Sequence, residues 1–408
     1  MENCTTITAC LACGGNDLVL TLDLNTQPLA NNFRDPGDTT DEIRYPLAIN
    51  RCAHCNHLQL THAVNPALIY THYLYVSGTS ETYLEYMDWY AKFVNEYTGQ
   101  QFGSILDIGC NDGSQLTAFK NLGFETHGVD PAENLFPISS ASHSVYCGFW
   151  GEDIVRRMHL RQKFDIITTQ NAFAHILDPL AYLKLAGEQL HRGGKIFIST
   201  SQADMVLNGE FDTIYHEHIS YYNAASMKAL AERAGLHLID VIKTPIHGTS
   251  YIFVLARTPA NNHHVNNILA MEAAQGLNKA ETYALWAEGV EDLLDSLRDK
   301  IFRHHNKGRK IVGYGAAAKG MTLLNASGIK LDAVIDDNPL KQGLVCPGNG
   351  IPVVGIEYLD TLAWNPPATV VFVPLAWNFY TEIKRKIQSR RDFHADKFMR
   401  YFPRITIE

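Results

Sequence analysis

Two Cys-x-x-Cys motifs near the N-terminus constrain the fold of this chain most strongly. Cys10 and Cys13 form the first, Cys52 and Cys55 the second, and the loop between them is rich in Asn, Asp, Pro and Thr. So short and polar a segment buries too little apolar surface to fold without a cross-link such as a bound metal ion. Four thiolates in two pairs suit tetrahedral zinc. The sequence therefore predicts a zinc-binding module over residues 1–65 with these four cysteines as ligands.

Length and composition indicate a globular protein of several domains. The chain has 408 residues, 46% of them hydrophobic and 19% charged, which suits about two to three domains. Its net charge is −9, and it lacks the Lys/Arg run that a nucleic-acid partner requires. It shows neither a signal peptide nor an apolar stretch long enough to cross a bilayer. We therefore expect a cytoplasmic protein without nucleic-acid or membrane partners, as a monomer or a homodimer.

The rest of the chain alternates short apolar runs with helical segments, which is typical of parallel α/β folds. The first series includes SILDIG, THGVD, FDIITTQ and GKIFISTS, and the second includes KIVGYGAAAKG, AVIDDNP and TVVFVPLAWN. The predicted fold class is α/β, with a Rossmann-like domain over 66–258 and a second Rossmann-like domain over 259–408.

The run ILDIGCNDG reads as a strand that ends in a glycine turn and leads into a helix. It resembles the first motif of class I S-adenosylmethionine methyltransferases, and Asp130 resembles their second-strand acid, which binds a ribose. A nicotinamide site is the alternative, but the run lacks the G-x-G-x-x-G pattern. An ordinary strand-to-helix turn is the alternative for residues 170–172. The predicted cofactor-binding residues are Asp107, Gly109, Cys110, Asn111, Asp112, Gly113, Asp130, Pro131, Gln170, Asn171 and Ala172.

The densest group of reactive side chains lies in the run TIYHEHISYY at 213–222. Its two histidines and one carboxylate do not have the HExxH spacing of a zinc protease, so metal binding here is a weaker interpretation. The sequence does not fix whether His216 or His218 reaches a substrate, and packed or surface histidines are a further alternative.

Six segments resemble, in their order, the sugar C-methyltransferases of deoxysugar biosynthesis: the two Cys-x-x-Cys motifs, DIGCNDG, NAFAHILD, YHEHISYY and GYGAAAKGMTLLN. The resemblance covers nearly the whole chain. It implies S-adenosylmethionine and zinc as cofactors and a dTDP-linked 4-keto-6-deoxyhexose as substrate. It also implies catalytic roles for His218 as base, with Glu217, Tyr215, His175 and Tyr75, the last preferred over Tyr73; the identity of the base among His216, His218 and the tyrosines stays open.

The expected reaction is methylation of C3, because the C–H bond beside the ketone is acidic enough to yield an enolate. A base must remove that proton, and a donor must stabilise the charge on the C4 oxygen. In the second α/β series, the turn GYGAAAKG offers backbone amides and Lys319 to a pyrophosphate. We expect Tyr314, Lys319 and Asn325 to bind the nucleotide-sugar. A second cofactor, with Asp336 as its ribose acid, is the competing interpretation.

Two other classes of function remain open from the sequence. A zinc-containing RNA methyltransferase would fit the cysteine motifs but not the acidic net charge. A non-catalytic nucleotide-sugar-binding protein would keep the fold, although the intact His218 and Glu217 argue against it.

Overall fold

The computed structural model describes two compact units, each built from several stretches of chain. The described residues are 3–71, 73, 76–79, 81–99, 103–158, 163–200, 204–245, 249–260, 263–362 and 369–408. Unit 1 comprises 1–19, 50–203 and 217–278, and unit 2 comprises 20–49, 204–216 and 279–408. The strands β2 (Leu18–Gln27) and β3 (Tyr45–Cys52) carry the chain between the units. The division into domains at residues 65 and 258 remains a prediction.

Unit 1 is built on a seven-stranded sheet. In spatial order its strands are β12 (His237–Thr244), β13 (Ser250–Ala256), β10 (Leu190–Thr200), β9 (Phe164–Gln170), β6 (Ser104–Ile108), β7 (Glu125–Asp130) and β8 (Ser144–Cys147). The five strands from β10 to β8 are parallel, and β13 is antiparallel to both of its neighbours. The chain runs outward from β6 to β8 and then restarts at β9 on the other side of β6. The strand order therefore reverses between β6 and β9, where ligands bind in folds of this kind.

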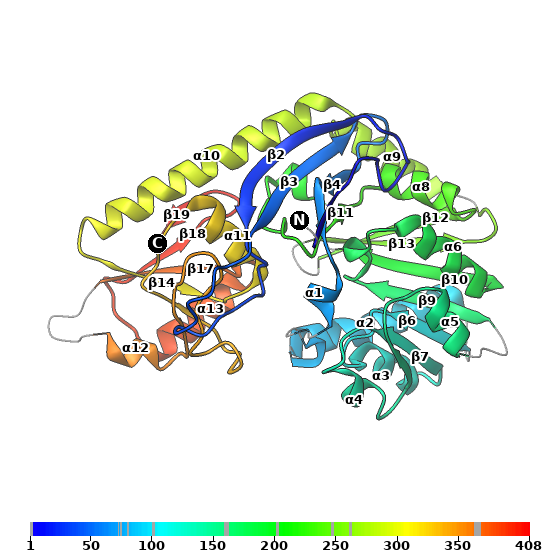
Figure 1. Cartoon of the computed structure of the whole chain (residues 1–408), viewed down its shortest axis with the longest axis horizontal. Coiled ribbons are helices and arrows are strands. Elements are labelled where there is room, and N and C mark those ends of the chain that lie inside the picture. Colours follow the sequence, from blue (N-terminus) through cyan, green and yellow to red (C-terminus); the bar gives the residue numbers. More distant parts are fainter. Residues whose placement is uncertain are drawn as a thin grey trace. The chain divides into compact units, whose positions relative to one another are not determined.

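Helices connect and cover this sheet (Figure 1). The helical segments of unit 1 are α1 (Ala67–Tyr70), η1 (Ser77–Thr79), α2 (Glu81–Thr98), α3 (Ser114–Asn121), α4 (Phe136–Ser139), α5 (Glu152–Met158), η2 (Phe173–His175), α6 (Pro179–Gln189), α8 (Ala224–Arg233) and α9 (His263–Ala274). Two short antiparallel pairs complete the unit. They join β1 (Cys4–Thr6) to β5 (His62–Val64), and β4 (Leu58–Leu60) to β11 (Ser220–Tyr221).

Unit 2 contains a second, six-stranded sheet. Its spatial order is β16 (Val353–Val354), β15 (Ala333–Ile335), β14 (Lys310–Tyr314), β17 (Val370–Pro374), β18 (Lys397–Arg400) and β19 (Thr406–Ile407). All pairs are parallel except β18 with β19. The order reverses between β14 and β17, so this sheet also has a switch point. The two sheets confirm the α/β class and both Rossmann-like folds expected from the sequence.

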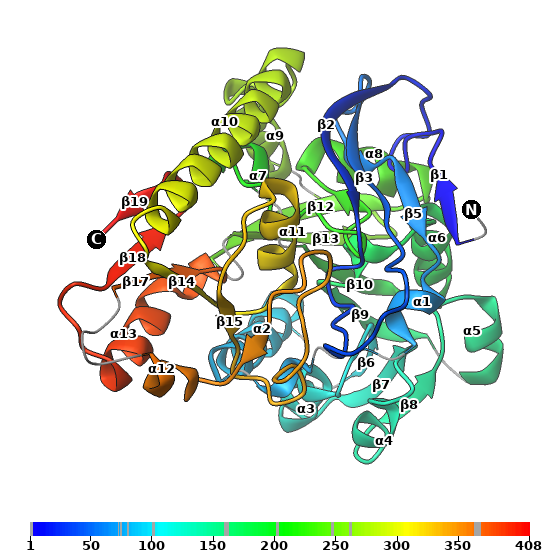
Figure 2. The same cartoon turned by 60° about the vertical axis from the view of Figure 1, so that its left-hand side comes forward.

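The helices of unit 2 are α7 (Met205–Asn208), α10 (Ala280–His305), α11 (Ala318–Ser327), α12 (Tyr358–Thr361), η3 (Trp377–Phe379) and α13 (Tyr380–Arg390). The longest, α10, packs against α11 and β14 (Figure 2). It is amphipathic because Trp286, Val290, Leu294 and Leu297 recur at helical spacing and are buried.

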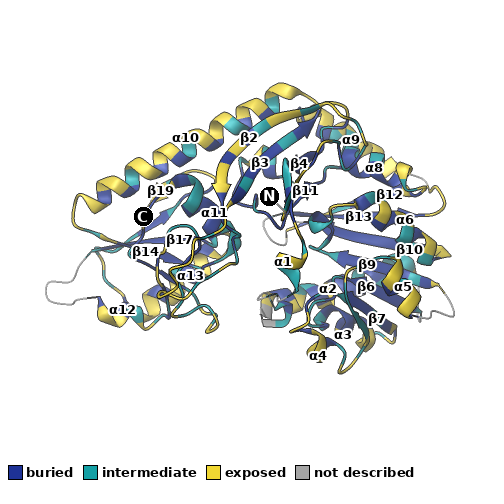
Figure 3. Ribbon diagram, viewed as in Figure 1, coloured by how far each residue is buried: buried dark blue, intermediate teal, exposed yellow. Residues whose placement is uncertain are grey.

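The inner strands of the two sheets are among the most deeply buried elements. Every residue of β6, β13 and β17 is buried, whereas α10 alternates buried and exposed positions (Figure 3). Strands covered on both faces read as continuous apolar runs, which explains sequences such as VVFVP. Among the described residues, no helix combines the length and apolar character needed to cross a membrane.

Candidate active site and metal centre

The four cysteines of the Cys-x-x-Cys motifs converge in unit 1. Their sulfur atoms all lie within 4.8 Å of one another. Cys10 Sγ lies 3.6 Å from Cys55 Sγ, and Cys13 Sγ lies 3.5 Å from Cys52 Sγ. Sulfurs bonded at about 2.3 Å to one tetrahedral zinc ion stand about 3.8 Å apart. The donor set therefore fits zinc, as expected, and four thiolates leave no coordination position for a substrate.

The glycine turn after β6 lies at the switch point of the unit 1 sheet. Gly109 and Gly113 have φ of 87° and 84°, and Asn111 has φ of 50°. These left-handed conformations favour Gly and are tolerated by Asn. A Cβ atom on Gly109 would stand 2.6 Å from Ala172 Cβ, because the turn passes directly against the loop that follows β9. Position 109 therefore requires glycine, because the backbone of this turn lies close to the loop after β9, at the place where a cofactor would bind.

Two acids face this turn. Asp107 is 3% exposed, and its Oδ1 has no hydrogen-bond partner. Burial and the nearby charge of Asp130 raise the pKa of Asp107 to about 8. Both oxygens of Asp130 accept backbone N–H groups, from Asn111 and Ala132, each at 2.8 Å. A buried carboxyl without a partner suits a cationic ligand group, such as the amino group of a methionine moiety.

The loop after β9 adds two more unsatisfied acceptors. Gln170 Oε1 and Asn171 Oδ1 are buried without a partner. The Asn171 N–H donates to Ser199 O at 2.9 Å, and its Nδ2 donates to Tyr83 Oη at 3.1 Å, so the residue is held rigidly. With Asp107, these acceptors line both sides of the switch point and fit the amino and hydroxyl donors of S-adenosylmethionine.

The remaining predicted cofactor residues shape the turn. Asp112 accepts the N–H of Gly78 at 2.8 Å and the N–H of Ser114 at 3.1 Å. Asn111 Oδ1 accepts the N–H of Ser77 at 2.9 Å, so η1 is tied to the turn. Cys110 is a buried thiol. Pro131 follows the end of β7 directly, and Ala172 lies two residues after the end of β9.

A cluster of aromatic and ionisable side chains lies elsewhere in unit 1. Tyr73 Oη donates to Glu217 Oε2 at 2.9 Å, and Tyr70 Oη donates to Glu217 O at 3.1 Å. The His175 ring stacks between two others, with centroid distances of 5.3 Å to Tyr70 and 5.2 Å to His218. Four elements or loops therefore bring together Tyr70, Tyr73, His175, Glu217 and His218, which we call the His–Tyr cluster.

Two members of the His–Tyr cluster are shielded from water, whereas Tyr70, Tyr73 and His175 are half-buried. Glu217 is 4% exposed and His218 is 6% exposed. Burial lowers the pKa of His175 to about 4, so this ring is neutral near pH 7 and can donate one N–H. Its Nε2 has no hydrogen-bond partner. A neutral, unpartnered imidazole beside a second histidine is suited to binding a polar substrate group.

The other predicted catalytic residues fall outside this cluster or outside the described residues. Tyr215 and His216 belong to unit 2, where Tyr215 is half-buried and the His216 ring is 3.3 Å from Tyr45 O. Burial lowers the pKa of His216 to about 4. Tyr75 lies outside the described residues, and the neighbouring Tyr73 makes the contact with Glu217. Sequence reasoning missed Tyr70, whose only signal is the tyrosine-rich segment that it begins.

In unit 2, Tyr314 and Lys319 lie at the second switch point, and Asn325 lies near the end of α11. Tyr314, at the end of β14, donates to both carboxylate oxygens of Asp337 at 3.0 and 3.2 Å. Lys319 Nζ has no hydrogen-bond partner and lies 5.1 Å from the centroid of the Trp377 ring. Asn325 Nδ2 donates to Pro347 O at 3.1 Å, so Asn325 holds a neighbouring loop.

Two buried acids near Lys319 were not predicted. Asp212 accepts from Trp377 Nε1 at 2.8 Å and from Tyr401 Oη at 2.9 Å. Burial raises the pKa of Asp212 and of Glu210, while the positive charge of Lys319 lowers both. No local pattern indicates this grouping, because its members come from segments far apart in the chain.

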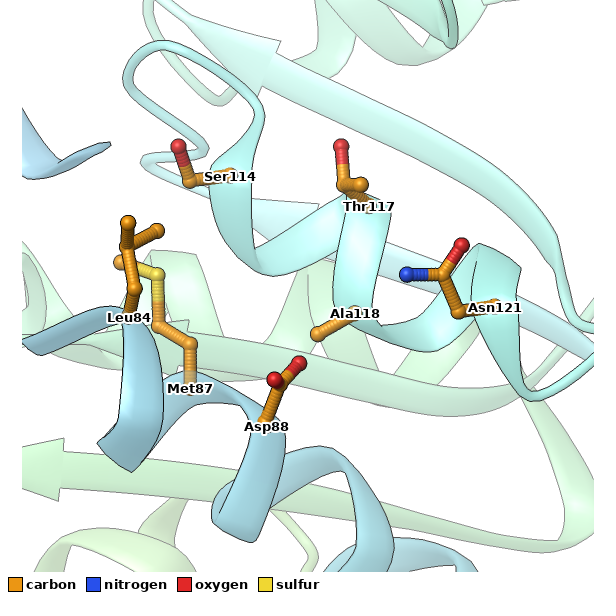
Figure 4. Close-up of a pocket in the computed structure, with 7 residues that line it drawn as sticks. All are labelled: Leu84, Met87, Asp88, Ser114, Thr117, Ala118 and Asn121. Carbon is orange, nitrogen blue, oxygen red and sulfur yellow. The ribbon is translucent and has the colours of Figure 1, made fainter. Parts of the chain in front are cut away.

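A hollow of about 270 Å³ lies between α2 and α3 (Figure 4). Leu84, Met87 and Asp88 line it from α2, and Thr117 and Asn121 from α3. None of the predicted site residues lines it, so we do not assign it to the reaction.

Comparisons with known proteins match the whole chain. Three family models cover it in order: a zinc binding domain over residues 10–70, a methyltransferase domain over 80–241, and a C-methyltransferase C-terminal domain over 245–403. C-methyltransferase NovU of Streptomyces niveus is 30% identical over 407 residues, which cover 95% of this chain and 93% of that protein.

Other matches cover less than half of the chain. A ubiquinone biosynthesis O-methyltransferase of Coxiella burnetii is 24% identical over 186 residues, covering 42% of this chain and 80% of the relative. Among solved structures, an S-adenosylmethionine-dependent methyltransferase from Clostridium acetobutylicum covers 42% of this chain and 91% of its own, with 13% identity and a TM-score of 0.35.

The matched methyltransferase domains and the relative define an S-adenosylmethionine-dependent methyltransferase. More specifically, the chain belongs to the zinc-containing C-methyltransferase family that includes NovU, and its cofactors are S-adenosylmethionine and zinc.

Proposed function

We propose that this C-methyltransferase acts on a nucleotide-linked 4-keto-6-deoxyhexose, most specifically at C3 of a dTDP-linked sugar, in the biosynthesis of a branched deoxysugar. The segments YHEHISYY and GYGAAAKGMTLLN, which resemble the sugar C-methyltransferases, support this substrate class. The observation that carries the proposal is the His–Tyr cluster, since a carbon nucleophile requires a base and an oxyanion donor in one shielded place.

His218 acts as the base that removes the proton from C3. It is nearly buried and stacks on His175, whereas the alternative His216 faces the carbonyl of Tyr45 in unit 2. The proton moves to the His218 imidazole, and the C–H electron pair becomes an enolate with its charge on the C4 oxygen. A neutral His175 or the hydroxyl of Tyr75 donates to that oxygen, because the hydroxyl protons of Tyr70 and Tyr73 are donated to Glu217.

Glu217 orients the tyrosines rather than the sugar. Its side chain and its carbonyl accept the hydroxyl groups of Tyr73 and Tyr70, so one residue sets the direction of both. When bound, S-adenosylmethionine supplies an electrophilic methyl group and leaves as a neutral thioether. The enolate carbon forms the new C–C bond, and His218 then releases its proton to solvent.

Unit 2 binds the nucleotide. Lys319, without a hydrogen-bond partner, and the backbone amides of the GYGAAAKG turn suit a pyrophosphate. Asp336, the ribose acid of the competing second-cofactor interpretation, has the same hydrogen-bond pattern as Asp130 of unit 1, so that interpretation stays open. The two oxygens of Asp336 accept the N–H groups of Ala316 and Asn338 at 2.6 and 2.8 Å.

Mass spectrometry of reactions with S-adenosylmethionine and a panel of dTDP-4-keto-6-deoxyhexoses tests the proposal. We expect one methyl group to appear on the sugar, at C3 by NMR. Methylation of an oxygen, or no methylation of any sugar while the protein binds S-adenosylmethionine, would contradict the assigned substrate.

A further inference from the structure

Each Cys-x-x-Cys motif forms one zinc knuckle. The second knuckle, at Cys52 and Cys55, leads directly into a strand that holds the catalytic segment, residues 217–222. The Asn56 N–H donates to Cys52 O at 3.0 Å, and the Cys52 N–H donates to His57 O at 2.9 Å. The chain therefore reverses after Cys55 and enters β4. Strand β4 pairs antiparallel with β11, with Leu58 opposite Tyr221.

The pairing with β4 extends to the residue beside His218. The Leu60 N–H donates to Ile219 O at 2.8 Å, and the Ile219 N–H donates to Ala174 O at 2.8 Å. Both backbone groups of Ile219 are thus fixed, one by the zinc module and the other by η2, which ends at His175. These two hydrogen bonds therefore also fix the position of the neighbouring residue, His218.

Two fully buried side chains reinforce the link. His57 Nε2 is 3.2 Å from Ser220 Oγ, and the His57 ring lies 4.7 Å from that of Tyr222. Gln59 accepts the N–H of Leu11 at 2.8 Å and donates to Ala9 O at 3.0 Å, both next to the ligand Cys10. The first knuckle is therefore tied to the same strand as the second.

We propose that His57 and Gln59 are positioning residues through which the zinc module fixes the place of His218. The inference rests on the proposed function only in treating His218 as catalytic. Zinc holds the two knuckles together beside β4, and pairing with β4 sets the register of the catalytic segment. Zinc then contributes to the reaction without touching the substrate.

Hydrogen exchange of the purified zinc-loaded enzyme tests this link without any substrate. In a His57→Gln variant that retains zinc, we expect the amides of residues 217–222 to exchange about tenfold faster, since the buried imidazole ring that packs against Tyr222 is lost. We expect kcat to fall and the affinity for S-adenosylmethionine to stay unchanged. Removal of zinc with a chelator should expose the same amides, but not those of β14.

His54→Gln is the matched control, because His54 lies in the same knuckle but is exposed, with its Nε2 3.1 Å from Asp17. It should change neither exchange nor kcat. If His57→Gln loses zinc or fails to fold, Ser220→Ala, which removes the other partner of the bond, decides. Unchanged exchange of 217–222 in the variants that fold, or equal changes in the control, would overturn the proposal. Faster exchange in an enzyme that methylates no sugar would contradict the proposed function alone.

Discussion

The buried carboxyl of Asp107 makes the free energy of unfolding depend on pH. Its folded pKa of about 8 lies above the usual value of 3.8. Between these values the folded state holds a proton that the unfolded state has released, so the free energy of unfolding decreases as pH rises, by up to about 1.4 kcal/mol per pH unit. This stability is fully present below pH 4 and is lost as the pH approaches 8.

Asp107→Asn should therefore lessen the fall in Tm of the cofactor-free protein between pH 6 and pH 8. It should also weaken S-adenosylmethionine binding by about tenfold or more, because an amide cannot supply the charge. Calorimetry and thermal melts measure both effects, with Asp153→Asn on the surface of α5 as control. An equal fall in Tm in wild type and variant would show that Asp107 is not protonated in the folded state.

At the residue scale, the sequence was informative where function depends on local pattern. The four cysteines and the glycine turn were predictable because their spacing carries the chemistry. Tyr70 was not, nor was the Asp212 group. Their roles depend on contacts such as the one from Trp377 to Asp212, 165 residues away, which no local pattern encodes.

At the scale of elements, the turn between β6 and α3 depends on Gly109. Alanine there would be strained by the positive φ and would also meet Ala172 Cβ at 2.6 Å. Gly235→Ala is a matched control, since Gly235 has φ of 72° but open space around it. Both variants should lose about 1 kcal/mol from backbone strain.

Only Gly109→Ala should weaken S-adenosylmethionine binding, by about tenfold or more, because it separates the two loops of the cradle. Thermal melts and titration calorimetry measure the two effects. Equal binding in both variants would contradict the close approach.

The alternation of strands and helices was predictable from apolar runs, whereas the strand order was not, because pairing partners are set by tertiary packing.

At the scale of the whole molecule, we propose that S-adenosylmethionine binds to unit 1 and the nucleotide to unit 2. Lys319→Met should weaken binding of dTDP by about tenfold or more, since a charge-assisted phosphate contact is lost, while leaving S-adenosylmethionine binding unchanged. Lys330→Met, at an exposed lysine of the same unit, is the control. Unchanged dTDP affinity in Lys319→Met, measured by calorimetry, would remove the nucleotide from this switch point.

Solvent-deuterium exchange into the sugar tests the central claim most directly, because it reports proton removal separately from methyl transfer. The enzyme is incubated in deuterated water with S-adenosylhomocysteine and the sugar that it methylates, beside His218→Gln. We predict deuterium at the carbon next to the ketone with wild type, and at least about a hundredfold slower exchange with the variant, as expected for loss of a general base. Equal exchange in both proteins would show that His218 is not the base, and no exchange in wild type would contradict an enolate formed before methyl transfer.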